Sequence, residues 1–116
     1  MDNYTESAKL FKTLMHPARL EILEILRDGE HCVCHIEAAL GYRQAYISQQ
    51  LSVLREAGLI QDRRDGWNIY YRVIQPKVFD VLDTAQAVTG VKRSRRKPAV
   101  DNCPCPQCSP VEVVAA

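Results

Sequence analysis

Two short amphipathic segments joined by a tight, glycine-containing link constrain the fold of this chain more than any other feature. The first spans about residues 33–40 and is followed by Gly41, and the second runs from about residue 44 to residue 57 and is followed by Gly58. Both carry apolar residues at helical spacing, and glycine is the residue that most readily ends a helix. This arrangement predicts a helix-turn-helix.

A β-hairpin is predicted directly after the second of these helices. Asp65-Gly66 lies between two strand-like runs, residues 59–64 and residues 67–74, and the second run is rich in aromatic and β-branched side chains. An Asp-Gly pair flanked in this way is a strong short-range hairpin signal. A hairpin in this position is the wing of a winged helix-turn-helix.

Three further helices complete the predicted domain. We expect them over residues 5–15, over residues 17–28, where Pro17 suits a first helical position, and between Pro76 and Gly90. A chain of 116 residues can hold one domain with one modest core. The predicted organisation is a mainly α domain with a β-hairpin wing over residues 1–91 and a basic, cysteine-containing flexible tail over residues 92–116.

Composition excludes several other classes of protein. The hydrophobic fraction of 47% is ordinary for a globular chain, and no apolar run approaches the length that crosses a bilayer. The polar start of the chain has no apolar segment of the kind found in signal peptides. We therefore expect a cytoplasmic protein with no membrane partner. No nucleophile–base constellation, phosphate loop or paired-carboxylate motif is present in the sequence, so we do not expect an enzyme.

The second helix of the pair has a polar face suited to DNA. Ile47, Leu51 and Leu54 fall on one side of the helical wheel and are expected to pack inward. The opposite side is small and amide-rich, and glutamine, serine and alanine side chains can contact base edges. The expected DNA-contacting residues of this helix and the link before it are Arg43, Gln44, Ala45, Tyr46, Ser48, Gln49 and Ser52.

The predicted hairpin adds positive charge to this surface. Arg63, Arg64 and Arg72 are expected to contact the phosphate backbone, which positions a protein on DNA without reading its sequence. The alternative for the helix alone is a solvated face of an amphipathic segment. The order of helix, turn, helix and basic hairpin favours double-stranded DNA as the partner.

All five cysteines of the chain fall in two short clusters. Cys32 and Cys34 frame one valine, and the other three lie within six residues near the end of the chain. In a reducing compartment, thiols at such spacing indicate a soft metal or metalloid more than a disulfide framework. The predicted ligands are Cys32, Cys34, Cys103, Cys105 and Cys108. The alternatives are buried core residues for the first cluster and incidental thiols in a loose tail for the second.

The two clusters differ in geometry. Two positions apart on a regular helix, Cys32 and Cys34 would point in nearly opposite directions, so one of them must lie in an irregular first turn to share an ion. In the tail, Pro104 and Pro106 keep the backbone extended, and three thiols suit trivalent arsenic, whereas zinc or cadmium would need a fourth donor.

Other charged and titratable groups lie close to the thiols. His31 and His35 flank the first cluster, but such histidines are more often surface groups than ligands. The basic run at residues 92–97 precedes the second cluster, and it either contacts DNA backbone or keeps the tail solvated.

Several segments of the chain resemble the ArsR/SmtB family of metal-sensing repressors. Residues 47–60 are similar to the recognition-helix signature of that family, residues 63–72 to its wing, residues 16–23 to its second-helix motif and residues 30–36 to its metal box. The resemblance covers roughly residues 8–75. The family often has histidine where Gln50 stands, which would alter base preference.

The resemblance implies a winged-helix homodimer that represses its own operon and leaves DNA when metal binds. The match is most like the arsenic-responsive members, so As(III), with Sb(III) beside it, is the expected inducer. Arsenic-responsive members often have a third cysteine near the position of Glu37, and cadmium- and lead-responsive members take thiols from an amino-terminal arm; both are missing from this sequence.

Several alternatives stay open at this point. The same scaffold can respond to Cd(II), Pb(II) or Zn(II), or it can sense thiol oxidation or persulfide without a metal. A protein of another class, a winged-helix protein-interaction module with a structural zinc in its tail, also fits the cysteines.

Overall fold

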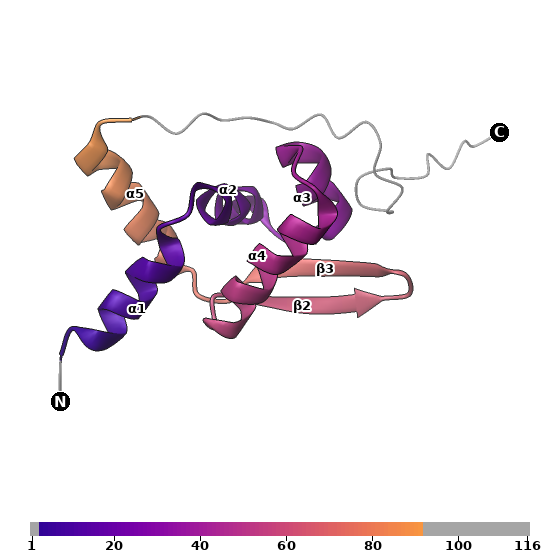
Figure 1. Ribbon diagram of the computed structural model, residues 1–116, viewed down its shortest axis with the longest axis horizontal. Coiled ribbons are helices and arrows are strands. Elements are labelled where there is room, and N and C mark those ends of the chain that lie inside the picture. Colours follow the sequence, from indigo (N-terminus) through magenta and orange to yellow (C-terminus); the bar gives the residue numbers. More distant parts are fainter. Residues whose placement is uncertain (1–2, 92–116) are drawn as a thin grey trace.

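The computed structural model describes residues 3–91, which form a mainly helical domain with a small antiparallel sheet (Figure 1). In chain order the elements are α1 Thr5–Leu14, α2 Pro17–Ile25, the 3-10 helix η1 Leu26–Asp28, β1 His31–Cys32, α3 Val33–Leu40, α4 Gln44–Glu56, β2 Ile60–Asp65, β3 Asn68–Val73 and α5 Lys77–Thr89. The predicted winged helix-turn-helix is confirmed. The predicted tail, with its basic run and its three cysteines, lies outside the described residues.

One hydrophobic core joins the helices to the sheet. The inward side of α4 supplies Ile47, Leu51 and Leu54, each fully buried, as the helical wheel predicted. They pack with Ile22 and Leu23 of α2 in the same cluster. Burying an aliphatic side chain of this size stabilises a fold by roughly 1.5–3 kcal/mol. None of the helices within residues 3–91 has both the length and the apolar character needed to span a membrane.

The sheet contains a third strand that sequence patterns did not reveal. Its order is β1-β3-β2, and both pairings are antiparallel. The short strand β1 places His31 opposite Tyr71 and Cys32 opposite Tyr70. Two residues are too few to show an alternating pattern, which is why the strand was missed. Its consequence is that the segment before α3 is attached to the wing.

The predicted hairpin is confirmed, although its connecting residues differ by one from the Asp65-Gly66 pair. Asp65 pairs with Asn68, so Gly66 and Trp67 form the connection. Gly66 has φ +60°, and none of the other residue types within residues 3–91 has a positive φ. A two-residue turn with glycine first and a negative φ at the second position has the backbone of a type II′ hairpin. Trp67 is fully exposed at the tip.

Three of the predicted helix ends also differ, and one of them is that of α4, which ends at Glu56, one residue before the predicted end. The helix expected over residues 17–28 ends at Ile25, and the chain tightens into the 3-10 turn η1 before Gly29, which has φ +138°. A 3-10 turn at the end of an α-helix is common because it pairs carbonyls that the α-helix leaves unsatisfied. The first helix ends at Leu14, one residue before the predicted Met15, because Pro17 follows closely.

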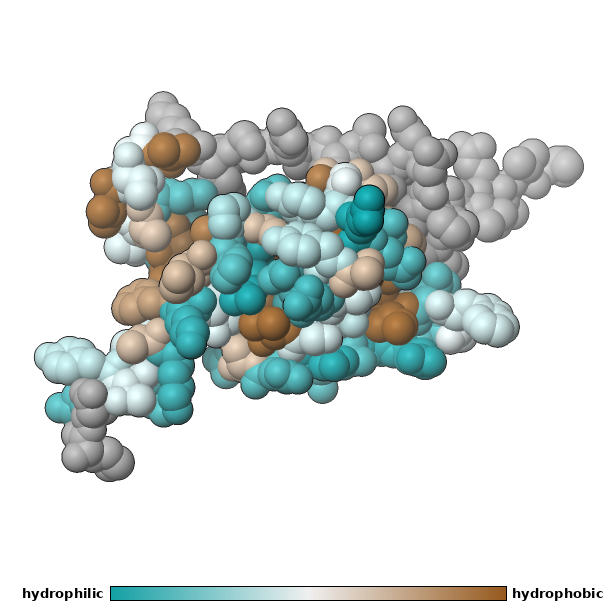
Figure 2. Space-filling view, in the orientation of Figure 1, coloured by the Kyte–Doolittle hydropathy of each residue, from teal (hydrophilic) through white to brown (hydrophobic). Residues whose placement is uncertain are grey.

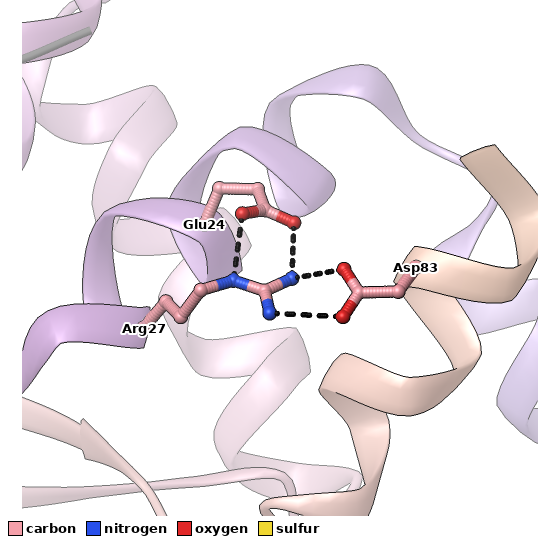
Figure 3. A network of polar contacts seen from close by, with 3 residues as sticks. All are labelled: Glu24, Arg27 and Asp83. Atoms are coloured by element: carbon pink, nitrogen blue, oxygen red, sulfur yellow. Dashed lines mark hydrogen bonds and ion pairs between the residues drawn. The ribbon is translucent and has the colours of Figure 1, made fainter. Parts of the chain in front are cut away.

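A charged network attaches the last helix to the rest of the domain (Figure 3). The Arg27 guanidinium in η1 donates to Glu24 at 3.0 and 2.9 Å and to Asp83 of α5 at 3.2 and 2.7 Å. It also lies 4.6 Å from the ring centroid of Phe79. The hydrogen bond with Glu24 raises the pKa of Arg27 above its ordinary range. One side chain therefore joins segments 56 positions apart.

We expect Arg27→Ala to lower the free energy of unfolding by about 1–2 kcal/mol, because both carboxylates lose their shared donor. Urea unfolding measures this change. Lys9→Ala is the matched control, because the Lys9–Glu6 pair at 3.3 Å is largely exposed and should contribute little. Equal effects for the two substitutions would contradict the importance assigned to Arg27.

Candidate DNA interface and thiol pair

The helix-turn-helix is formed by α3, a three-residue link and α4. Gly41 ends α3 in the left-handed conformation, with φ +73°, and its N–H donates to the Glu37 carbonyl at 2.8 Å. Arg43 is the extended residue before α4. Of the residues predicted to contact DNA, Arg43, Gln44, Ala45, Tyr46, Ser48 and Gln49 are exposed and Ser52 is half-buried. The structure therefore gathers them on an accessible face of α4 and its start, while the DNA contact itself stays a prediction.

Tyr42 and Tyr46 pack against each other at the start of α4. The rings of Tyr42 and Tyr46 meet edge to face, with centroids 5.2 Å apart. The Tyr42 hydroxyl donates to Glu21 of α2 at 3.1 Å, and this bond raises the pKa of Tyr42. Sequence reasoning did not assign a role to Tyr42, although its place in the link between the two helices was a signal that could have found it.

Gln50 does not belong to the DNA-facing side of α4. It is 5% exposed, and its Oε1 accepts a hydrogen bond from Arg19 Nε at 2.7 Å. Arg19 Nη1 also donates to the Thr13 carbonyl at 3.1 Å. The expectation that this position alters base preference needs correction, because the side chain is buried. Its contact fixes α4 against α2 and the end of α1.

Gln49 and Gln50 are neighbours on α4, and substituting each in turn tests whether the first faces DNA and the second faces the core. Gln50→Ala should lower the free energy of unfolding by about 1–3 kcal/mol, because the half-buried Arg19 loses an acceptor. Gln49→Ala should leave stability within about 0.5 kcal/mol, since Gln49 is exposed, and should weaken binding to operator DNA. Urea unfolding and fluorescence anisotropy of labelled DNA measure the two effects. The opposite pattern would show that the two side chains have been assigned to the wrong sides of α4.

The three arginines predicted to hold phosphate are placed differently in the wing. Arg63 binds both carboxylate oxygens of Glu30, at 2.6 and 3.1 Å, and lies 4.7 Å from the ring centroid of Tyr70. Arg72 donates to Gln61 at 2.9 Å. Arg64 is exposed and lies on the other face of the hairpin from Arg63. Arg64 therefore remains the stronger candidate for a phosphate contact.

The thiol pair lies where β1 ends and α3 begins. Cys32 is extended, with φ −78° and ψ 160°, is 1% exposed, and its Sγ accepts the His35 N–H at 3.3 Å. Cys34 is the second residue of α3 and is half-buried. Cys32 therefore lies outside the regular helix, which is the condition for the two cysteines to share an ion, and that sharing stays a prediction.

The two cysteines are not bonded to each other. Cys34 is disulfide-bonded and Cys32 is not. Any ligand that needs both sulfurs therefore needs the reduced form of Cys34. Within residues 3–91, no group of three or more histidine, cysteine, aspartate or glutamate side chains is placed to hold a metal ion. The described residues include two cysteines, Cys32 and Cys34, so a three-sulfur site needs a thiol from elsewhere.

The two histidines beside the thiols stack on each other. Their ring centroids are 4.2 Å apart and their planes differ by 11°. Burial lowers the pKa of both His31 and His35, and His31 also lowers that of His35. Neutral rings can stack without charge repulsion. The pair thus packs along the segment that holds the cysteines, and a role as ligands stays a prediction.

Comparison with known proteins gives consistent matches. Residues 16–62 match the model of the family described as bacterial regulatory protein, arsR family. A biofilm growth-associated repressor of Agrobacterium fabrum is 45% identical over 84 residues, 72% of each chain. The arsenic resistance transcriptional regulator ArsR1 of Pseudomonas putida is 46% identical over 75 residues, 64% of this chain and 58% of its own.

Solved structures agree with these relatives. The crystal structure of Rv0081 of Mycobacterium tuberculosis has a TM-score of 0.70 and 37% identity, covering 78% of this chain and 91% of its own. The homodimeric winged helix-turn-helix domain Mb0332 of Mycobacterium bovis, a possible ArsR-family regulator, has a TM-score of 0.66 and 29% identity over 78% of this chain and 88% of its own. The winged-helix fold is therefore shared along most of the described chain.

Proposed function

Because this chain belongs to the arsR family of bacterial regulatory proteins, we propose that it represses transcription by binding operator DNA and releases that DNA when As(III) binds its cysteines. Membership in a family of DNA-binding regulators disfavours the interaction-module alternative. Similarity to an arsenic resistance regulator supports the choice of arsenic, and so does the paired thiol motif beside the helix-turn-helix.

The DNA-binding form is proposed to be a homodimer. In the described chain, α1, α5 and the residues next to them carry the exposed apolar side chains Tyr4, Phe11, Met15, Val88 and Val91. Figure 1 places both helices at the end of the molecule opposite the hairpin tip, and Figure 2 shows hydrophobic side chains gathered over α5. Pairing of these helices with a second copy would bury them and would present one α4 to each half-site of a near-palindromic operator.

The observation that carries the arsenic response is the position of Cys32. Its Sγ accepts the first-turn N–H of His35, so the sulfur that we propose as a ligand also caps α3. Bonding to arsenic would draw this sulfur away from the cap, and the loss of an N-terminal cap costs a helix about 1 kcal/mol. Since α3 packs against α4, the change reaches the recognition helix.

The chemistry of the site is proposed to be ligand exchange on arsenic. Each arsenic–sulfur bond replaces one arsenic–hydroxyl bond of arsenous acid, and the thiol proton leaves with that hydroxyl as water. Cys32 and Cys34 supply two sulfurs, and we assign the third to one of Cys103, Cys105 and Cys108. Sb(III) has the same preference for sulfur, while Cd(II), Pb(II) and Zn(II) remain alternatives that would recruit further donors.

The test uses fluorescence anisotropy of labelled DNA from upstream of the gene, with reduced full-length protein. Arsenite at near-stoichiometric amounts should weaken wild-type binding by about 5- to 150-fold, the usual range of allosteric coupling. Cys32→Ser and Cys34→Ser should bind DNA and lose this response. The serine at position 32 keeps an oxygen that can cap α3, which separates ligation from folding.

Two outcomes would contradict the proposal. An unchanged response in both serine variants would exclude these thiols as the ligands. A wild-type protein that binds DNA tightly and ignores arsenite would exclude arsenic as inducer, and the same titration with Cd(II), Pb(II) and Zn(II) would then follow.

Thiol oxidation is a second candidate signal, and the disulfide of Cys34 is the observation that favours it. In that case, oxidised protein without any metal would lose DNA affinity, and a thiol reductant would restore it. Reduced protein would then be insensitive to arsenite. The arsenic proposal requires the reverse, because only the reduced form offers both sulfurs.

A further inference from the structure

We propose that ligand binding at Cys32 and Cys34 changes the contact of the wing with DNA as well as that of α4. The change reaches the wing through β1, the Glu30–Arg63 ion pair and Tyr70. This inference rests on the function proposed above and concerns how ligand binding at the same site changes the affinity for DNA. It assigns Glu30 and Arg63 as positioning residues of the wing.

The backbone provides the first part of this connection. Cys32 is at once the last residue of β1 and the residue that caps α3. Through β1 it pairs with Tyr70 in the middle of β3. A displacement of Cys32 toward a bound ligand must therefore disturb both the start of α3 and the edge of the sheet. Because β1 pairs with β3 at only two positions, this edge has little pairing to hold it in place.

Side chains provide the second part. Glu30 directly precedes β1, and it accepts two hydrogen bonds from Arg63 in β2, 33 positions later. The Arg63 guanidinium in turn covers the ring of Tyr70, the residue that pairs with Cys32. A two-pronged arginine–carboxylate contact fixes orientation as well as distance. The segment that holds the thiols is thus tied to both strands of the hairpin.

The faces of the hairpin explain why Arg63 and its neighbour should differ. Arg63 is opposite Tyr70, and Arg64 is opposite Ile69, so their side chains leave the sheet on opposite faces. Both arginines are exposed, but Arg63 lies on the face that carries Tyr70 and is bound to Glu30, whereas Arg64 lies on the other face. We therefore assign Arg63 to positioning the hairpin and Arg64 to the DNA backbone. The two residues form a matched pair for experiment.

The test compares Kd for operator DNA with and without arsenite in reduced, full-length wild type and in Glu30→Gln, Arg63→Gln and Arg64→Gln. The quantity of interest is the ratio of the two Kd values, because a loss of general stability or of a simple DNA contact changes both values together. If wild type loses about tenfold or more in affinity on adding arsenite, Glu30→Gln and Arg63→Gln should each lose less than about threefold. Arg64→Gln should bind more weakly in both states and keep the wild-type ratio.

Combining Glu30→Gln with Arg63→Gln should change the ratio no further than either substitution alone, since both remove the same contact. Thermal unfolding of each variant without arsenite confirms that it is folded. If the ratio of Kd values with and without arsenite were the same in Glu30→Gln and Arg63→Gln as in wild type, the inference would be overturned and the proposed function would stand. A wild type that does not respond to arsenite would overturn the proposed function and, with it, the wing as its output.

Discussion

The junction between β1 and α3 depends on one sulfur atom. Cys32 Sγ is buried, and it accepts the His35 N–H at the point where extended backbone becomes helix. An unsatisfied first-turn N–H would weaken a helix of only eight residues. The orientation of α3, and through it the packing of α4, therefore depends on where this sulfur points. A ligand that competes for the sulfur acts directly on the helix-turn-helix.

Three arginine side chains make long-range polar connections between elements of the domain. Arg19 joins α2 to Gln50 in α4, Arg27 joins η1 to Asp83 in α5, and Arg63 joins the wing to Glu30. A guanidinium suits this task because its planar array of donors can reach more than one acceptor at once. A domain with one modest core thus gains defined positions for its first helix, its last helix and its wing. These are the parts that dimerisation and DNA binding are proposed to use.

The helices and the hairpin were predictable because each has a local signal. Periodic apolar residues marked α4, and the Asp65-Gly66 pair marked the hairpin even though the turn itself uses Gly66 and Trp67. The sequence also indicated that, for the two cysteines to share an ion, one of them must lie in an irregular first turn. Strand β1 could not be found in this way, because its two residues are held by pairing with β3 and not by a local pattern.

The partners of polar side chains were the least predictable part of the candidate site. Gln50 was expected to influence base preference, because the family often has histidine there, yet it is buried and accepts a hydrogen bond from Arg19, 31 positions earlier. Arg63 and Arg64 are adjacent, chemically identical and both exposed, and they differ in the face of the hairpin on which they lie, since Arg63 lies on the face where it binds Glu30. Helical and strand periodicity can assign these side chains to a face of their element, but the partners Arg19 and Glu30 come from distant segments, which periodicity and spacing do not encode.

Hydrogen exchange at the His35 amide is the most direct measurement of the central claim, that a ligand draws the Cys32 sulfur away from the cap of α3. Reduced protein would be followed by nuclear magnetic resonance during titration with arsenite. The account predicts slow exchange without arsenite and faster exchange once arsenite is bound, because the N–H loses its acceptor. An unchanged exchange rate of the His35 amide in protein that has bound arsenite and released DNA would contradict the account.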